Sequence, residues 1–256
     1  MMSWQGLSTR FLCTFIPQKN GRQTQLFPIL PRAWGAVSMI DRLIGFALAT
    51  TALVFTSVAA AGDWEEVAYD KDEDIRVYTR YVEGSDMKAF KGVTTLESTV
   101  TAPVALLQDV KRAHEWVFNC KAMDLIEEIA PNNATYYTVT SMPWPVKNRD
   151  NISESLVTQD ASSGVVTVTI QARNDIFPSN DDHVRIRELD ATWTLEPQAD
   201  GLLKVTYEAH ADPGGGLPSW LVNSFVVEAP LNTLRDFREL VVDEKYQSAS
   251  REYITH

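Results

Sequence analysis

The sequence has little cysteine, since Cys13 and Cys120 are the two among its 256 residues. If residues 1–61 are removed as a leader, Cys120 alone remains, and one cysteine cannot form an internal disulfide. Histidine is also scarce, and no two histidines stand at a spacing typical of metal ligands: His114, His183, His210 and His256. We therefore expect no disulfide and no metal site, and a fold stabilised by its hydrophobic core.

Signatures of common enzyme classes are missing after residue 61. There is no Gly-x-Ser-x-Gly nucleophile motif and no phosphate-binding loop. Gly214–Gly216 precedes an expected helix, but no Lys-Ser/Thr follows, and Asp212 beside it repels phosphate. We interpret the three glycines as a turn. No combination of nucleophile, base and orienting residue is visible, and no cofactor is expected.

Residues 39–61 have the pattern of an export signal. A charged start, Met39–Arg42, precedes an apolar run, Leu43–Val58, which ends in three alanines. This order is typical of a secretory signal peptide. We expect cleavage after Ala61 and export, in a bacterium to the periplasm. The alternative is an uncleaved membrane anchor, because the run is just long enough to span a bilayer.

Residues 1–38 lie upstream of that signal and contain four basic residues and no acidic one. An export signal acts at the N-terminus, so we interpret this segment as the product of a start codon assigned too early, with a functional basic arm as the alternative. Residues 62–256 hold 18 Lys and Arg against 33 Asp and Glu, a net charge of −15. That charge repels phosphate backbones, so nucleic-acid binding is not expected.

The rest of the chain predicts an α+β domain. A helix is expected over residues 104–112, with Thr101 as its N-cap and Pro103 in its first turn. Period-two patterns and short polar turns predict an antiparallel sheet. Its strands are expected at 75–82, 89–98, 122–129, 135–142, 151–158, 165–172, 184–195 and 203–210.

A long apolar-striped helix is expected to follow the last strand, beginning at Leu217-Pro218. Pro230 lies inside this helix. A proline removes one backbone hydrogen bond and clashes with the preceding turn, so we expect a kink near residues 226–229. A strand that hands over to such a helix suggests a helix laid across a curved sheet, which can enclose an apolar cavity.

The ordered set of motifs resembles the START family, the StAR-related lipid-transfer domains. The motifs are Trp64, Ile75–Arg80, Phe90–Gly92, Trp116, Pro145–Asp150, Trp193 before Glu196-Pro197, and Asp212–Pro218 leading into a helix with Asn223. The resemblance implies one domain over residues 62–256 with a helix-grip fold: a curved antiparallel β-sheet wrapped around a long C-terminal helix, with an internal hydrophobic tunnel. One departure is Ser155, where lipid-transfer members often carry a second arginine that faces the cavity.

Arg149 is a candidate ligand contact, since its guanidinium offers paired donors to a ligand oxygen or phosphate. The alternative is a structural Arg–carboxylate pair that fixes the strand end, as Arg149-Asp150 suggests. Five aromatic residues are candidates for a pocket wall, and for Trp193, as for Trp116, a plain core position is favoured: Trp144, Trp193, Tyr207, Trp220 and Phe225. Asn223 and Val227, on the final helix, complete the candidate ligand-binding residues.

The leading hypothesis is an exported, non-enzymatic carrier or sensor that binds a single lipid or sterol-like ligand in an internal cavity. Such a carrier also makes transient contact with membranes. The alternative is a helix-grip enzyme of the cyclase type acting on a hydrophobic substrate, with Glu208, His210 or Asp212 as acid or base. A third reading is a protein-interaction module with a collapsed cavity. The sequence carries no pattern that assigns an oligomeric state.

Overall fold

A curved, ten-stranded sheet forms the frame of the computed structural model, which describes residues 63–176 and 181–255. The strands follow the order β1-β2-β3-β10-β9-β7-β6-β5-β4 and are antiparallel, while the short β8 pairs parallel with the start of β6. Their bounds are β1 Glu65–Asp70, β2 Ile75–Tyr81, β3 Lys88–Glu97, β4 Cys120–Ala130, β5 Asn133–Thr140, β6 Arg149–Gln159, β7 Val166–Ala172, β8 Val184–Arg185, β9 Glu188–Pro197 and β10 Leu202–Asp212.

Alternating side chains explain why these segments form strands with one buried face. In β2, Ile75, Val77 and Thr79 are buried, and the residues between them are only half-buried. Leu203 and Val205 repeat the pattern in β10. Successive side chains of a strand point to opposite faces, so a period of two places every second residue against the core.

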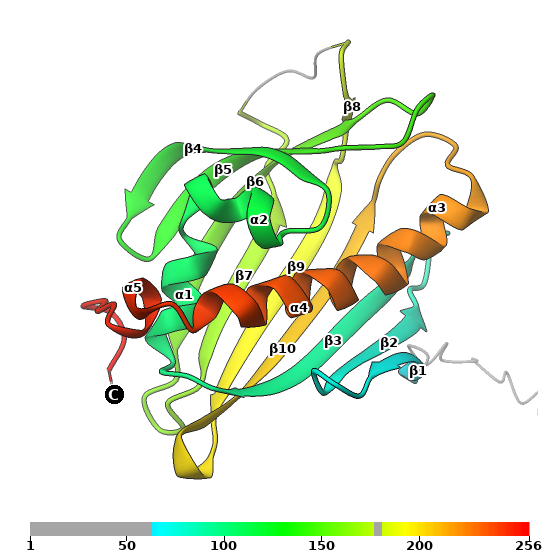
Figure 1. The fold of residues 1–256 in the computed structure, drawn as a ribbon. Helices are drawn as coiled ribbons and strands as arrows, with labels where there is room; N and C mark the ends of the chain where they lie inside the picture. The colour runs from blue at the N-terminus through cyan, green and yellow to red at the C-terminus, as the bar shows by residue number, and fades with distance from the viewer. Residues whose placement is uncertain (1–62, 177–180, 256) are drawn as a thin grey trace, which may run out of the picture. The chain divides into compact units, whose positions relative to one another are not determined.

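The helices lie on one face of this sheet (Figure 1). Two short ones, α1 (Thr101–Leu107) and α2 (Ala113–Trp116), come between β3 and β4, and the others follow β10: α3 (Ser219–Asn223), α4 (Ala229–Val241) and α5 (Glu244–Gln247). In Figure 1, α3 and α4 form one long helix across β7, β9, β10 and β3. The α+β helix-grip architecture expected from the sequence is confirmed. Among the described residues, no helix has both the length and the apolar character needed to cross a membrane.

The long helix changes its winding immediately before Pro230. Residues Ser224–Glu228 form a π-helical turn between α3 and α4. Pro230 has no N–H to offer the carbonyl of Val226, and its ring would collide with that carbonyl in a regular α-turn. A wider turn, with bonds to the fifth residue, removes the collision. The irregularity expected at 226–229 is therefore a π-turn within a continuous helix.

Several expected bounds were wrong. Strand β1 was missed, and the expected strand 184–195 is interrupted between Arg185 and Glu188. The expected helix 104–112 is instead α1, a 3₁₀ turn at Val110–Arg112 and α2. Thr101 is not the N-cap but lies inside α1, fully buried, and the Thr99 hydroxyl accepts the Ala102 N–H at 3.3 Å. The expected leader, residues 1–61, lies outside the described residues.

Gly92 sets how closely the helix approaches the sheet. It lies in β3, and a Cβ built on it would stand 2.5 Å from Cδ1 of Leu234 and 3.5 Å from Cβ of Pro230, both in α4. Beside this contact, Trp116, Trp193 and Phe237 pack ring against ring, with centroids 5.1–5.9 Å apart. The core of the domain therefore lies between α1, α2, α4 and the middle of the sheet.

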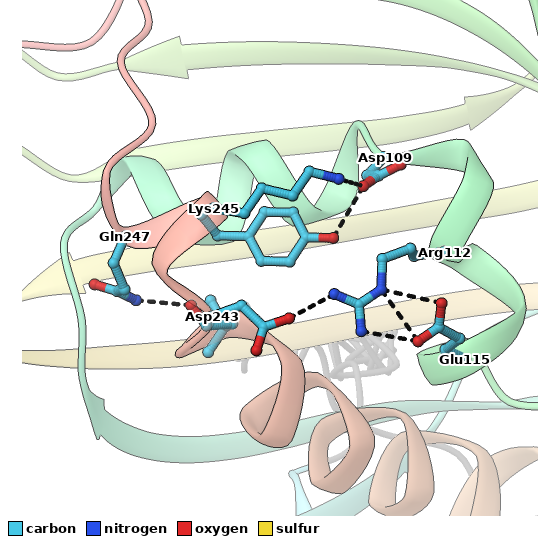
Figure 2. A network of polar contacts seen from close by, with 8 residues as sticks. Asp109, Arg112, Glu115, Asp243, Lys245 and Gln247 are labelled. Carbon is cyan, nitrogen blue, oxygen red and sulfur yellow. Dashed lines mark hydrogen bonds and ion pairs between the residues drawn. The ribbon is translucent and has the colours of Figure 1, made fainter.

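A polar network holds the C-terminal end of the helix to the α1–α2 segment (Figure 2). Arg112 donates to Glu115 and, at 2.5 Å, to Asp243, which follows α4 and is the N-cap residue of α5. Asp109 accepts hydrogen bonds from Lys245 and from the Tyr246 hydroxyl, both in α5. This end of the long helix is thus cross-linked several times to the segment between β3 and β4.

Candidate functional site

A cavity of about 240 Å³ lies between the inner face of the sheet and the long helix. Strands β3, β5, β6, β7, β9 and β10 contribute alternate residues to its wall. The helix contributes Phe225, Val226, Ala229 and Thr233. The cavity therefore occupies the place where the helix-grip architecture encloses space between helix and sheet.

One wall of the cavity is aromatic. Trp193 and Tyr207 face each other across β9 and β10, and their rings stack with centroids 4.3 Å apart and 14° between the planes. Phe90 of β3 meets Tyr207 edge to face at 5.1 Å. Burial raises the pKa of Tyr207 to about 12, because the ionised phenolate is poorly solvated there. This wall offers a flat apolar surface to a hydrocarbon ligand.

The opposite wall, on β5 and β6, is polar but uncharged. It is made by alternate residues of the two strands: Tyr136, Thr138 and Thr140 on β5, and Asn151, Ser153 and Ser155 on β6. The strands pair so that Tyr136 is opposite Ser153 and Thr138 is opposite Asn151. We call these six residues the polar wall. Their side chains share one face of the sheet because they stand two residues apart along each strand.

The segment between α2 and β4 meets the long helix at the edge of the cavity. The rings of Phe118 and Phe225 meet edge to face with centroids 6.4 Å apart. The backbone N–H of Phe118 donates to the Thr233 hydroxyl at 3.1 Å. These contacts join the π-turn and α4 to the chain that precedes β4.

Arg149 is buried, with 3% of its surface exposed, but it does not line the cavity. Its guanidinium donates to the carbonyl oxygens of Lys147, Pro213 and Gly214 at 2.5–3.2 Å. Burial lowers the pKa of Arg149, because the charged form is poorly solvated. Arg149 therefore ties the turn after β10 to the loop before β6.

The Arg–carboxylate pair expected at this strand end exists, but Arg185 is the arginine that makes it. Both oxygens of Asp150 accept hydrogen bonds from Arg185 at 2.9 Å, and the Tyr137 hydroxyl donates to the same carboxylate at 3.2 Å. Burial, the largest single effect, raises the pKa of Asp150, but Arg185, Tyr137 and His183 together outweigh it and the net pKa is lowered. Sequence reasoning missed Arg185 because only the parallel pairing of β8 with β6 brings it beside Asp150.

The structure separates the predicted ligand-binding residues into two groups. Trp193, Tyr207 and Phe225 lie on the cavity wall. The other four do not, which corrects their expected position: Arg149, Trp220, Asn223 and Val227. Trp220 is 59% exposed, and Trp144, also expected near the pocket, is 93% exposed. For all seven residues, contact with a ligand stays a prediction.

The winding of the helix explains the misplaced helical residues. An apolar stripe at regular α-helical spacing pointed to Trp220 and Val227 as the inner positions. The π-turn at Ser224–Glu228 shifts the helical phase, and the structure puts Val226 inside in place of Val227, while Phe225 lies on the wall as predicted. Pro230 signals an irregular turn in the sequence. Whether that turn becomes a kink or a π-turn, which shifts the later side chains around the helix, is not visible in the sequence.

The candidate acid–base residues near the last strand do not line the cavity. Tyr207, Ala209 and Ala211 are on its wall, so Glu208, His210 and Asp212 alternate to the other face of β10. The ring of His210 lies 3.0 Å from the Ser85 hydroxyl. Within residues 63–176 and 181–255, no three His, Cys, Asp or Glu side chains gather as a metal site would require.

Comparison with known proteins finds one family and several relatives. The model of the START domain matches residues 48–244. The uncharacterized protein PA1579 of Pseudomonas aeruginosa is 39% identical over 181 residues, covering 70% of this chain and 87% of that protein. START domain-containing protein 10 of human is 26% identical over 119 residues, which are 46% of this chain and 40% of that protein.

Solved structures with the same fold include members described as STAR-related proteins. A STAR-related lipid transfer protein fragment from Xanthomonas axonopodis has 35% sequence identity and a TM-score of 0.64, covering 70% of this chain and 99% of that chain. Human START domain-containing protein 10 has 18% identity and a TM-score of 0.61, covering 71% and 74%, a likeness of fold alone.

Proposed function

Because the chain belongs to the START domain family, we propose that it binds a single lipid or sterol-like molecule in its internal cavity and acts as an exported carrier or sensor without enzymatic activity. The cavity between the sheet and the long helix carries this proposal. Its wall joins a stacked pair of aromatic rings to a polar, uncharged strand pair. Apolar contact surface supplies the affinity, at about 25 cal/mol per Å² buried, and a few polar groups set orientation.

The description of one relative supports a non-enzymatic role. The protein from Xanthomonas axonopodis is described as a lipid transfer protein, and it shares 35% of its residues with this chain over 99% of its length. The alternative of a cyclase-type enzyme needs acid–base groups at the ligand. Glu208, His210 and Asp212 turn to the other face of β10, which favours the carrier.

The gate of the proposed carrier is the first part of the long helix. Residues 217–229 hold α3 and the π-turn, and they follow glycines with positive φ at Gly214 and Gly215. The C-terminal part of the same helix is fixed by the network of Figure 2. We therefore expect residues 217–229 to swing away from Phe118 while α4 stays in place.

Two exposed tryptophans support transient contact with a membrane. Trp144 and Trp220 belong to the β5–β6 connection and to α3, and Arg149 ties that connection to the loop that leads into α3. Tryptophan prefers the interface between lipid and water. Trp144→Ala with Trp220→Ala should slow ligand transfer between vesicles without lowering the melting temperature, whereas Tyr81→Ala, which removes another exposed aromatic, should change neither. Equal slowing in all variants would contradict this contact.

Native mass spectrometry of the protein purified from its own host tests the binding function. We expect a hydrophobic small molecule to remain bound at one molecule per chain. A protein that arrives empty and takes up no lipid from vesicles would favour the interaction-module reading, and turnover of a bound substrate would favour the enzyme.

Export is tested separately by sequencing the N-terminus of the same material. We propose that the mature chain begins at Gly62. A mature protein that begins before Leu43 would contradict cleavage at Ala61.

A further inference from the structure

The side chains of the polar wall form no hydrogen bonds with other described residues. Thr138, Asn151 and Ser153 are nonetheless more than nine-tenths buried, with 8%, 8% and 5% of their surfaces exposed. Buried hydroxyl and amide groups in folded proteins nearly always have a hydrogen-bond partner. These groups face the cavity, so water or a ligand inside it is their available partner, and a ligand that displaces the water must match their hydrogen bonds.

The cavity offers almost no charge to such a molecule. Among the described residues that line it, Lys88 is the one cationic residue, and none is acidic. The Lys88 ammonium lies 4.4 Å from the centre of the Tyr81 ring, and Tyr81 is 71% exposed, so this charge is held at the surface. Arg149 directs its guanidinium to three backbone carbonyls and not into the cavity.

The missing charge discriminates between ligand classes. An ionised phosphate or carboxylate loses its water on entering an apolar cavity and would find no counter-ion there, which is strongly unfavourable. Hydroxyls both donate and accept hydrogen bonds, and an asparagine amide offers two donors and an acceptor. Such a wall matches hydroxyl, ester or amide groups, which can donate or accept but carry no charge.

Resting on the ligand-binding function proposed above, we propose that the ligand is an uncharged amphiphile with one hydrocarbon chain. Its hydroxyl, ester or amide groups bond along Asn151, Ser153, Ser155 and Thr138, and its hydrocarbon lies on the ring of Trp193. The size of the cavity supports a single chain, since 240 Å³ lies below the range of roughly 300–1,000 Å³ usual for ligand pockets. Ser155 matters here because an arginine at this wall position would supply the charge that the cavity lacks.

Three probes with the same oleoyl chain test the proposal on the delipidated full-length protein: monooleoylglycerol, oleate and oleoyl lysophosphatidylcholine. Their dissociation constants are measured by titration below the concentrations at which they aggregate. We expect monooleoylglycerol to bind at least about tenfold more tightly than either charged probe. Equal or tighter binding of oleate or lysophosphatidylcholine would overturn the uncharged ligand and leave the carrier function standing. Failure of all three to bind would overturn both.

Variants of the polar wall locate the effect. Asn151→Leu and Ser153→Ala should each weaken monooleoylglycerol binding about fivefold to tenfold and leave oleate binding nearly unchanged. Thr158→Val is the matched control, because Thr158 is an exposed residue of β6 that does not line the cavity. Ser155→Arg should raise the affinity for oleate relative to monooleoylglycerol.

Melting curves establish that each variant is folded, and Ser153→Ala is the milder change if Asn151→Leu unfolds the protein. Wild-type preference among the probes in both Ser153→Ala and Ser155→Arg would overturn the assignment of the polar wall.

Discussion

Replacing Gly92 with alanine tests the contact that brings the long helix onto the sheet. The new Cβ would stand 2.5 Å from Cδ1 of Leu234 and 3.5 Å from Cβ of Pro230. Carbon atoms pack best at about 3.5–4.0 Å, so Leu234 or the helix must move by roughly 1 Å. Leu234 is fully buried, which leaves its side chain little room to turn away.

The cost follows from overpacking a close-packed core. Such substitutions destabilise by about 1–3 kcal/mol, and replacing a strand glycine by alanine returns about 0.5–1 kcal/mol. We expect Gly92→Ala to lower the free energy of unfolding by about 1–2 kcal/mol net. For a domain of this size, that lowers the melting temperature by roughly 2–8 °C.

A double-mutant cycle with Leu234→Val makes the reasoning specific. Valine lacks the δ carbon that clashes, so the two substitutions together should cost at least about 0.5 kcal/mol less than the sum of the single costs. Gly216→Ala is the control, since a Cβ there meets nothing within 4 Å. It should change the free energy of unfolding by less than about 0.5 kcal/mol. Urea denaturation measures all four variants. A wild-type midpoint in Gly92→Ala, or additive costs in the cycle, would refute the close-approach argument.

Three further predictions concern Arg149, the buried ion pair and the gate. Arg149→Met should lower the free energy of unfolding by at least about 1.5–3 kcal/mol, the range for one charge-assisted hydrogen bond, with bound-ligand composition unchanged; wild-type stability in urea would contradict the clamp. The Asp150 pKa is lowered in the folded state, so its contribution is complete above the ordinary value of 3.8 and lost as the pH falls through the folded pKa. Asp150→Asn, though less stable at neutral pH, should therefore lose less additional stability between pH 5 and acid; identical acid slopes in denaturation curves would argue against a lowered pKa of Asp150. Pro230→Ala should slow hydrogen exchange over residues 217–229 and slow ligand transfer between vesicles, with the same amount bound at equilibrium. Unchanged rates would place the gate in a loop.

The spacing of apolar side chains along the sequence predicted most of the strands and the long helix. Strands with a clear period of two, such as 75–82 and 203–210, were found to within two residues, because the period records which face is buried. The missed β1 has the weak pattern of an edge strand: Glu65–Asp70 contains no fully buried residue. The interrupted strand before Glu188 failed for another reason, since its first part pairs parallel with a strand far earlier in the chain.

The candidate site was predictable only in part. The side-chain period of β9 and β10 places Trp193 and Tyr207 on the concave face, and both lie on the cavity wall. The polar wall was missed, because Thr138, Asn151 and Ser153 have side chains that are as common on solvated strands as in a cavity. Only the helix packed across the sheet makes that face an interior one.

The sequence by itself determined most of the strands, the long final helix, the acidic net charge and the family, since local period, composition and motif order are properties of the chain. The tertiary structure decided which groups meet. Asp150 forms its ion pair with Arg185 and not with Arg149, because β8 pairs beside β6. The tertiary structure also put Val226 inside in place of Val227, because the helix absorbs Pro230 by widening one turn. Both outcomes depend on distances between residues remote in the chain or on how one turn relaxes, and neither leaves a local pattern to be read.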